Sequence, residues 1–347
     1  MHNPYSNVDT TTCPQVMTTT HDHLTDNNAS VSVADTFDNL YNGGIRCLAV
    51  SNYYPSKPMY PISDYAQEIG REPPLDIVEI PNAEHHHFSV KGYFGNSLHM
   101  NAVGSTFESG NLKGVSPVGY NGAAEQFVKD ALSELVYADG GGITLNHPGW
   151  TQRQSSFPDE NFIYMLDQDE RVLGIEIFSS DYTDHANDLA LWDKILNTGR
   201  KCFGFAVPDH RAKPPTGANR GANWLGRIML YVPNFTAYDC LKAIRNGEFY
   251  AKIRNTDFRF TKIAVEDDKL KVSTNQEATI RFIVDGITAN EFSGVTEAEC
   301  TFANAYNFIR AEAEIDNDAL FTQPIMMWVR PRGVANQTMN TKLYRAI

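Results

Sequence analysis

The stretch Gln15-Val-Met-Thr-Thr-Thr-His-Asp-His23 runs from a short strand pattern directly into a His-x-His pair. Its apolar and β-branched residues predict a strand over residues 15–20. Residues two apart in an extended strand point the same way, so His21 and His23 can approach one cation from the same side. Taken alone, the pair fits a solvated strand end about as well as a metal site, and only further ligands can decide.

Four more strand patterns along the chain carry His, Asp or Glu or end next to them. They are residues 76–84, ending at Glu84 before His85, His86 and His87; residues 143–146, ending before His147; residues 173–178, carrying Glu176; and residues 202–207, ending before Asp209 and His210. The carboxyl ends of strands in a parallel α/β barrel converge on one mouth, where catalytic residues collect. We therefore expect these side chains to meet in one metal-binding cavity, with at most one member of the 85–87 run among the ligands.

Strand and helix patterns alternate over the first 250 residues or so, which is typical of an α/β fold. The clearest helix patterns cover residues 123–137 and 185–196. After about residue 258 only short alternating stretches occur, and they predict a small antiparallel β domain resembling a sandwich. Because 347 residues suit a large barrel plus a second module, we expect a barrel domain over residues 1–257 and a β domain over residues 258–347.

Composition excludes several classes of protein. Hydrophobic residues make up 42% and charged residues 20%, as in ordinary globular proteins. The net charge of −13 disfavours nucleic-acid binding, which needs a field of Lys and Arg. No apolar run is long enough for a membrane span, and the first residues lack the apolar stretch of a signal peptide. The five cysteines form no Cys-x-x-Cys pair, which argues against a disulfide framework and favours a reducing, cytoplasmic compartment.

Two longer motifs, Asn146-His-Pro-Gly-Trp150 and Arg245-Asn-Gly-Glu-Phe-Tyr-Ala251, add specificity to the pattern of His, Asp and Glu. Together these residues resemble the PHP superfamily (polymerase and histidinol phosphatase type) of metal-dependent phosphoesterases. The similarity is to two-domain bacterial members with a C-terminal β module, and it covers roughly residues 3–257. It implies an α/β fold, a distorted (β/α)7 barrel, that binds two or three divalent ions.

The resemblance also implies a set of metal ligands. The first ion would be held by His21, His23, Glu84 and Asp209, and the second by Glu84, His99 and His147, with Asp26 and His210 as further candidates. Ligands of this kind without thiolate suit Zn, Mn or Fe. Two such ions can share a metal-bound hydroxide, which would attack phosphorus or a carbonyl carbon.

The ligands of a third ion are where the chain departs from the family. Tyr53 stands where the family has a histidine. Asp26 lies in Thr25-Asp26-Asn27 instead of a Ser-Asp-Gly turn, and Asp209-His210 is one residue shorter than the family's Asp-x-His ending. All three departures concern the same ion, so we expect two ions per chain and a third site that is weak or absent.

A group of cations follows Asp209 and His210 along the chain. Arg211, Lys213 and Arg220 suit an anion clamp for a phosphate, and a solvated loop explains them equally well. His210 and Arg211 are candidates to support catalysis, and Tyr53 is a candidate to line the pocket.

Four functions fit these observations. The first is hydrolysis of a phosphate ester, in particular a small monoester, and the second is hydrolysis of a carboxylic or carbamate ester on the same site. The third is a degenerate member that binds metal and ligand without turnover, for which Tyr53 is the motive. The fourth is a carbohydrate- or surface-binding protein that uses aromatic residues of the β domain such as Trp328. The expected partner is a small-molecule ester, with neither nucleic acid nor membrane.

Overall fold

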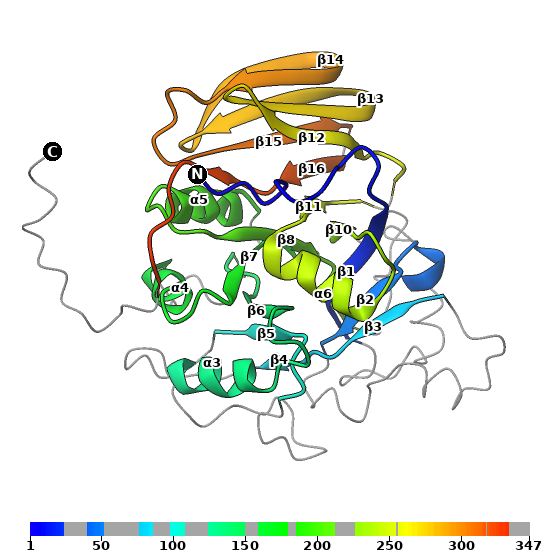
Figure 1. Cartoon of the computed structure of the whole chain (residues 1–347), viewed down its shortest axis with the longest axis vertical. Coiled ribbons are helices and arrows are strands. Elements are labelled where there is room, and N and C mark those ends of the chain that lie inside the picture. Colours follow the sequence, from blue (N-terminus) through cyan, green and yellow to red (C-terminus); the bar gives the residue numbers. More distant parts are fainter. Residues whose placement is uncertain are drawn as a thin grey trace, which may run out of the picture.

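A computed structural model describes residues 1–23, 40–51, 76–85, 98–107, 124–149, 159–179, 185–211, 226–254, 256–316 and 318–332 (Figure 1). The strands in these ranges form two hydrogen-bonded sheets, one of twelve strands and one of five. The larger sheet runs through the upper and right-hand parts of the molecule in Figure 1, and the smaller one through its centre.

The strands of the larger sheet are β1 (Gln15–His23), β2 (Cys47–Val50), β3 (Val78–Ile80), β9 (His210–Arg211), β10 (Arg227–Tyr231), β11 (Phe249–Lys252), β12 (Phe260–Glu266), β13 (Lys269–Val284), β14 (Ile287–Thr301), β15 (Phe308–Ile315), β16 (Asp318–Thr322) and β17 (Ile325–Met326). Their order is β12-β13-β15-β16-β11-β10-β1-β2-β3, with β14 beside β13, β17 beside β15 and β9 beside β1. β1 pairs in parallel with β2 and β9, and antiparallel with β10.

The strands of the smaller sheet are β4 (Glu84–His85), β5 (Met100–Val103), β6 (Gly142–Leu145), β7 (Val172–Ser179) and β8 (Phe203–Val207). They lie in this same order across the sheet. β4, β5 and β6 pair antiparallel, whereas β6, β7 and β8 pair in parallel.

The complete helices within the described ranges are α3 (Ala124–Ser133), α4 (Asp159–Leu166), α5 (His185–Leu196) and α6 (Ala237–Asn246). The first three share an apolar core with the five-stranded sheet, to which they contribute Phe127, Phe162 and Trp192. α6 begins after Thr236, whose hydroxyl accepts a backbone N–H, and ends at Gly247 in the left-handed conformation. None of the helices in these ranges combines the length and the apolar character that crossing a membrane requires.

The predicted (β/α)7 barrel is wrong. In such a barrel neighbouring strands are parallel and each is followed by a helix. Here β10 is antiparallel to both β1 and β11, β4 is antiparallel to β5, and β5 to β6. The strands after residue 258 pair antiparallel with one another, and through the pairing of β16 with β11 they are continuous with the larger sheet. Alternation of apolar and polar residues carries no information on strand direction, which explains the error.

The two sheets meet along β8, which contacts β1, β10 and β11. Phe203 and Phe205 of β8 pack against Phe249 of β11, with ring centroids 6.0 Å and 5.0 Å apart. Beyond β8, the backbone N–H of Asp209 donates to the carbonyl oxygen of His21 at 3.1 Å. This bond fixes the end of β8 beside the end of β1.

A buried ion pair lies where β11 meets β16. Lys252 Nζ donates to Asp318 Oδ2 at 2.7 Å and to the carbonyl oxygen of Phe258 at 2.6 Å, and the two charged side chains are 1% and 3% exposed. Asp318 Oδ1 also accepts the backbone N–H of Arg254 at 2.9 Å. Burial lowers the pKa of Lys252, although the negative charge of Asp318 and its hydrogen bond act in the opposite direction. Each of these buried charges is therefore stabilised by the opposite charge of its partner.

Gly174 of β7 lies opposite Phe203 of β8, and a Cβ at position 174 would overlap the backbone of Phe203. We expect Gly174→Ala to lower the free energy of unfolding by about 1–3 kcal/mol, because the two strands must move apart. Equilibrium unfolding in urea measures the change. Gly294→Ala is the control, since a Cβ there meets no atom within 4 Å and only its φ of 68° is strained. A loss at Gly174 no larger than the loss at Gly294 would contradict the prediction.

Candidate metal centre

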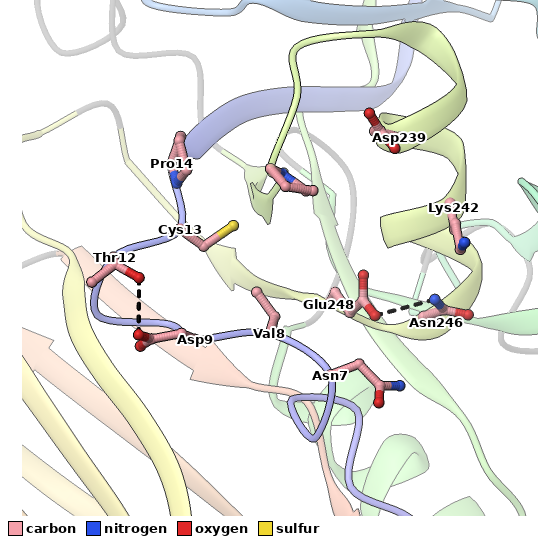
Figure 2. Close-up of a pocket in the computed structure, with 11 residues that line it drawn as sticks. Asn7, Val8, Asp9, Thr12, Cys13, Pro14, Asp239, Lys242, Asn246 and Glu248 are labelled. Atoms are coloured by element: carbon pink, nitrogen blue, oxygen red, sulfur yellow. Dashed lines mark hydrogen bonds between the residues drawn. The ribbon is translucent and has the colours of Figure 1, made fainter.

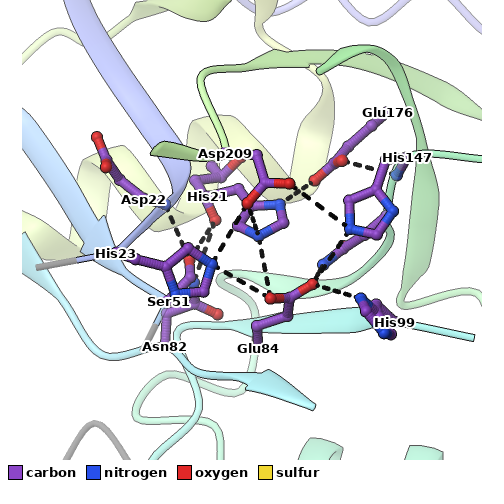
Figure 3. Close-up of polar contacts among 12 residues, drawn as sticks. His21, Asp22, His23, Ser51, Asn82, Glu84, His99, His147, Glu176 and Asp209 are labelled. Atoms are coloured by element: carbon purple, nitrogen blue, oxygen red, sulfur yellow. Dashed lines mark hydrogen bonds and ion pairs between the residues drawn. The ribbon is translucent and has the colours of Figure 1, made fainter. Parts of the chain in front are cut away.

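The end of β1 carries the His-x-His pair into the interior of the protein. His21 and His23 are both fully buried, and Figure 3 shows their rings turned towards Glu84 while the Asp22 carboxylate points away. This is the alternation of an extended strand. The backbone N–H of Asp22 donates to Ser51 Oγ at 3.2 Å, which holds the strand end against the end of β2.

Glu84 from β4 and Asp209 from the turn after β8 face this pair. His21 Nε2 lies 3.4 Å from Glu84 Oε2 and 3.2 Å from Asp209 Oδ1. His23 Nε2 lies 3.2 Å and 3.4 Å from the same two oxygens. These four residues form a first group of side chains that could hold a metal ion.

The other oxygen of Glu84 faces two further histidines. Glu84 Oε1 lies 2.9 Å from His99 Nδ1 and 3.2 Å from His147 Nε2. Asn146 Nδ2 donates to the same oxygen at 3.2 Å. Glu84, His99 and His147 form a second group that could hold a metal ion, and the group shares Glu84 with the first.

The spacing of these atoms fits metal coordination. Two ligand atoms held roughly 2.0–2.2 Å from one ion stand about 2.8–3.6 Å apart in tetrahedral or octahedral geometry. The N···O distances within the two groups run from 2.9 Å to 3.4 Å. Among the described residues, His21 Nε2 has no hydrogen-bond partner although it is buried and faces two carboxylates. A cation at the centre of each group would be coordinated by the histidine nitrogens and carboxylate oxygens of that group.

The electrostatics of the site also favour a cation. Burial alone would lower the pKa of His21, but the charges of Asp209, Glu176 and Glu84 outweigh burial and raise that pKa well above its usual value. Burial alone would raise the pKa of Asp209, but His21, a hydrogen bond from His23 and the charge of His147 hold that pKa well below its usual range. The site therefore keeps the Asp209 carboxylate ionised and attracts positive charge.

Two candidate ligands lie on strained backbone. His147 has a φ of 26° and Asp209 a φ of 41°, both in the left-handed region that residues with a Cβ rarely adopt. The backbone N–H of His147 is held by Glu176 Oε2 at 2.7 Å, and that of Asp209 by the carbonyl oxygen of His21 at 3.1 Å. Strain of this kind persists where surrounding contacts impose it, and it is common at functional sites.

Hydrogen bonds of Asn82 and Ser51 hold the segment that leads into the strand of Glu84. Asn82 Nδ2 donates to Ser51 Oγ at 2.6 Å and to the carbonyl oxygen of Thr20 at 3.1 Å. Both side chains are completely buried. These bonds tie the segment before Glu84 to the segment before His21, so the two ligands keep a fixed separation.

The structure brings together six of the residues predicted to bind metal, namely His21, His23, Glu84, His99, His147 and Asp209. His210 and Arg211 form β9 beside the end of β1, and only their backbone is described. His85 packs between Phe107 and Phe127, at ring-centroid distances of 5.7 Å and 4.7 Å, and belongs to neither ligand group. Outside the described residues lie the remaining predicted positions, Asp26, Tyr53, His86, His87, Lys213 and Arg220.

Sequence reasoning expected Glu176 in the metal-binding cavity but gave it no contact with a ligand, and it gave no role to Asn82 or Asn146. Glu176 and Asn146 contact candidate ligands directly, and Asn82 bonds to the segment before His21. For Glu176 a signal existed, because an acid inside the apolar run Leu173-Gly-Ile-Glu-Ile-Phe178 must find a partner when the strand is buried. The amide side chains carried no comparable signal, since Asn is common in loops.

A separate cavity of about 570 Å³ lies at the opposite end of β1 (Figure 2). Its lining includes Pro14, which precedes β1, and Asp239, Lys242 and Glu248 from α6 and the turn after it. β1 spans roughly 30 Å at about 3.3 Å per residue. This cavity is therefore remote from the candidate metal centre, and Glu248 offers a control position for substitutions there.

Comparison with known proteins finds similarity to a solved structure but to no family model. No protein-family model matches the chain, and no curated protein matches it at a significant level. One solved structure is similar over 91% of this chain and 95% of its own, with 13% sequence identity and a TM-score of 0.48. That protein is a two-domain protein from Bacteroides vulgatus containing a predicted PHP-like metal-dependent phosphoesterase. The roles of individual residues in this chain rest on the side-chain geometry.

Proposed function

We propose that this chain is a PHP-type metal-dependent phosphoesterase that works with two divalent ions. The observation that carries the proposal is the Glu84 carboxylate, whose Oε2 faces His21 and His23 while its Oε1 faces His99 and His147. A carboxylate shared in this way suits two ions a few Å apart, an arrangement used for hydrolysis of phosphate esters.

The residues of the site would hold such ions and keep bulk water out. Bound ions would act as Lewis acids and lower the pKa of water towards neutrality. Glu84 and Asp209 supply negative charge, and Asn146 orients Glu84 through its hydrogen bond to Oε1. The charged and imidazole side chains of the two groups are at most 10% exposed. In so dry a site, interactions with developing charge are stronger than in water.

A phosphate monoester is the substrate class that we favour, because its negative charge complements a centre with two cations. The cations that follow Asp209 in the sequence, Arg211, Lys213 and Arg220, support the same choice. Because the chain has a net charge of −13, it would repel an anionic substrate unless positive charge lay near the metal centre.

Removal of metal tests this proposal. Treatment with a chelator is expected to lower phosphate release from p-nitrophenyl phosphate by at least about 100-fold, and addition of Zn, Mn or Fe is expected to restore it. Metal content is measured in parallel, and a panel of carboxylic and carbamate esters is assayed under the same conditions. Cleavage of those esters without phosphate release, or two bound ions with turnover of neither class, would show that the proposed activity is wrong.

A further inference from the structure

Glu176 is a buried acid that contacts a ligand from each of the two groups. Its side chain lies on β7 and is 1% exposed. Its Oε1 lies 2.7 Å from His21 Nδ1, and its Oε2 accepts the backbone N–H of His147 at 2.7 Å (Figure 3). His21 belongs to the first ligand group and His147 to the second.

Glu176 itself lies outside both ligand groups. His21, His147 and Glu176 offer atoms close enough for a third ion. However, 2.7 Å is the length of a charge-assisted hydrogen bond and is shorter than the 2.9–3.4 Å N···O distances of the two ligand groups, so it fits a direct bond between Oε1 and His21 Nδ1 better than an ion between them. Oε2 is taken by a backbone N–H, which donates and cannot bind a cation. Both oxygens of Glu176 are therefore acceptors of hydrogen bonds from the ligands.

Each of these bonds orients a different ligand. A proton on His21 Nδ1 leaves the lone pair on Nε2, the atom that faces Glu84 and Asp209. The bond to the His147 backbone holds a residue with a φ of 26°, and so aims His147 Nε2 at Glu84 Oε1. Carboxylates that fix a ligating histidine through its second nitrogen typically change metal affinity about 10- to 100-fold.

We infer that Glu176 is a positioning residue that couples the two metal sites, because one rigid carboxylate orients one ligand of each. This inference rests on the proposed two-ion site and adds a residue to it. Loss of Glu176 weakens both ions together, whereas loss of a ligand that belongs to one group, such as His99, weakens only one.

The experiment is a titration of metal-free protein with Co²⁺ for wild type, Glu176→Ala, Glu176→Gln, His99→Ala and Glu248→Gln. We expect both dissociation constants to rise about 10- to 100-fold in Glu176→Ala, one to rise in His99→Ala, and neither to change in Glu248→Gln. The visible absorption of bound Co²⁺, which reports ligand geometry, should change in Glu176→Ala. Circular dichroism and urea unfolding of the metal-free variants separate these effects from loss of fold.

Glu176→Gln covers the case in which Glu176→Ala does not fold. The amide keeps the size of the side chain but presents an N–H group to one of the two donors, so at least one ion should bind more weakly. A folded Glu176→Ala that weakens only one ion, or a Glu176→Gln with wild-type affinity for both, would overturn the inference. In the His99→Ala background, Glu176→Ala must still weaken the remaining ion. Wild-type protein that binds two ions without releasing phosphate counts against the proposed function alone.

Discussion

Glu84→Gln is expected to leave at most one bound ion per chain and to lower phosphate release at least about 10³-fold. The reason is that an amide presents one oxygen where the carboxylate presents two. In the native site Oε2 faces His21 and His23, and Oε1 faces His99 and His147. The substitution also removes the negative charge that both groups share. Metal analysis of the purified protein and a phosphate-release assay measure the two effects.

Two comparisons make this result specific to the shared carboxylate. Glu248→Gln changes the same residue type in the remote cavity and should leave metal content and activity unchanged. His99→Ala removes a ligand from one group only, so it should retain one tightly bound ion. Glu84→Gln protein with two bound ions and more than about a tenth of wild-type activity would refute the bridging role.

Asp318→Ala is expected to lower the free energy of unfolding by about 3–5 kcal/mol, because it leaves the Lys252 ammonium buried without its counter-charge. Lys252 Nζ lies 2.7 Å from Asp318 Oδ2, and the two side chains are 1% and 3% exposed. The backbone N–H of Arg254 loses its acceptor as well. Equilibrium unfolding in urea, with circular dichroism as the signal, measures the loss.

An exposed ion pair in the same chain provides the matched control. Lys194 Nζ lies 3.0 Å from Asp159 Oδ2, but these side chains are 49% and 48% exposed. Asp159→Ala should therefore change stability by less than about 1 kcal/mol. The double variant Lys252→Met/Asp318→Leu should regain much of the stability lost in Asp318→Ala, since it removes both buried charges. A loss below about 1 kcal/mol in Asp318→Ala would show that the pair is unimportant.

The positions of most candidate ligands could be predicted because polar residues at the ends of apolar strands are conspicuous. His21, His23 and Glu84 are of this kind, and so are His147 and Asp209. His99 precedes β5 within Leu98-His99-Met100, and only the family resemblance pointed to it. Glu176 was visible as an acid in a strand, but its partner His21 lies 155 residues away, and no local pattern could reveal the contact.

The arrangement of the strands was harder to predict from the sequence, and the reason is physical. Periodicity shows which residues share a face, but it does not show the direction of the neighbouring strand. The sequence analysis did not predict β10 and β11. These two strands make the sheet antiparallel beside β1, where a barrel would have parallel strands. The long hairpin of β13 and β14 was read as short stretches, although Asp285-Gly286 between them is a strong turn signal. Both residues adopt positive φ, 49° and 82°, as a tight hairpin requires.

The pairing of β11 with β16 makes the stability of the two halves of the chain interdependent. Only β10 and β11 separate β16 from the strand that bears His21, so the C-terminal strands and β1 share one ladder of backbone bonds. When such a ladder unzips from one side, its neighbours lose their partners in turn. Loss of the strands over residues 260–326 would thus deprive β11 of its partner β16 and weaken the support of the strand that bears His21. Recombination that exchanged this half of the chain would have to offer β11 a replacement strand, or leave an open edge prone to aggregation.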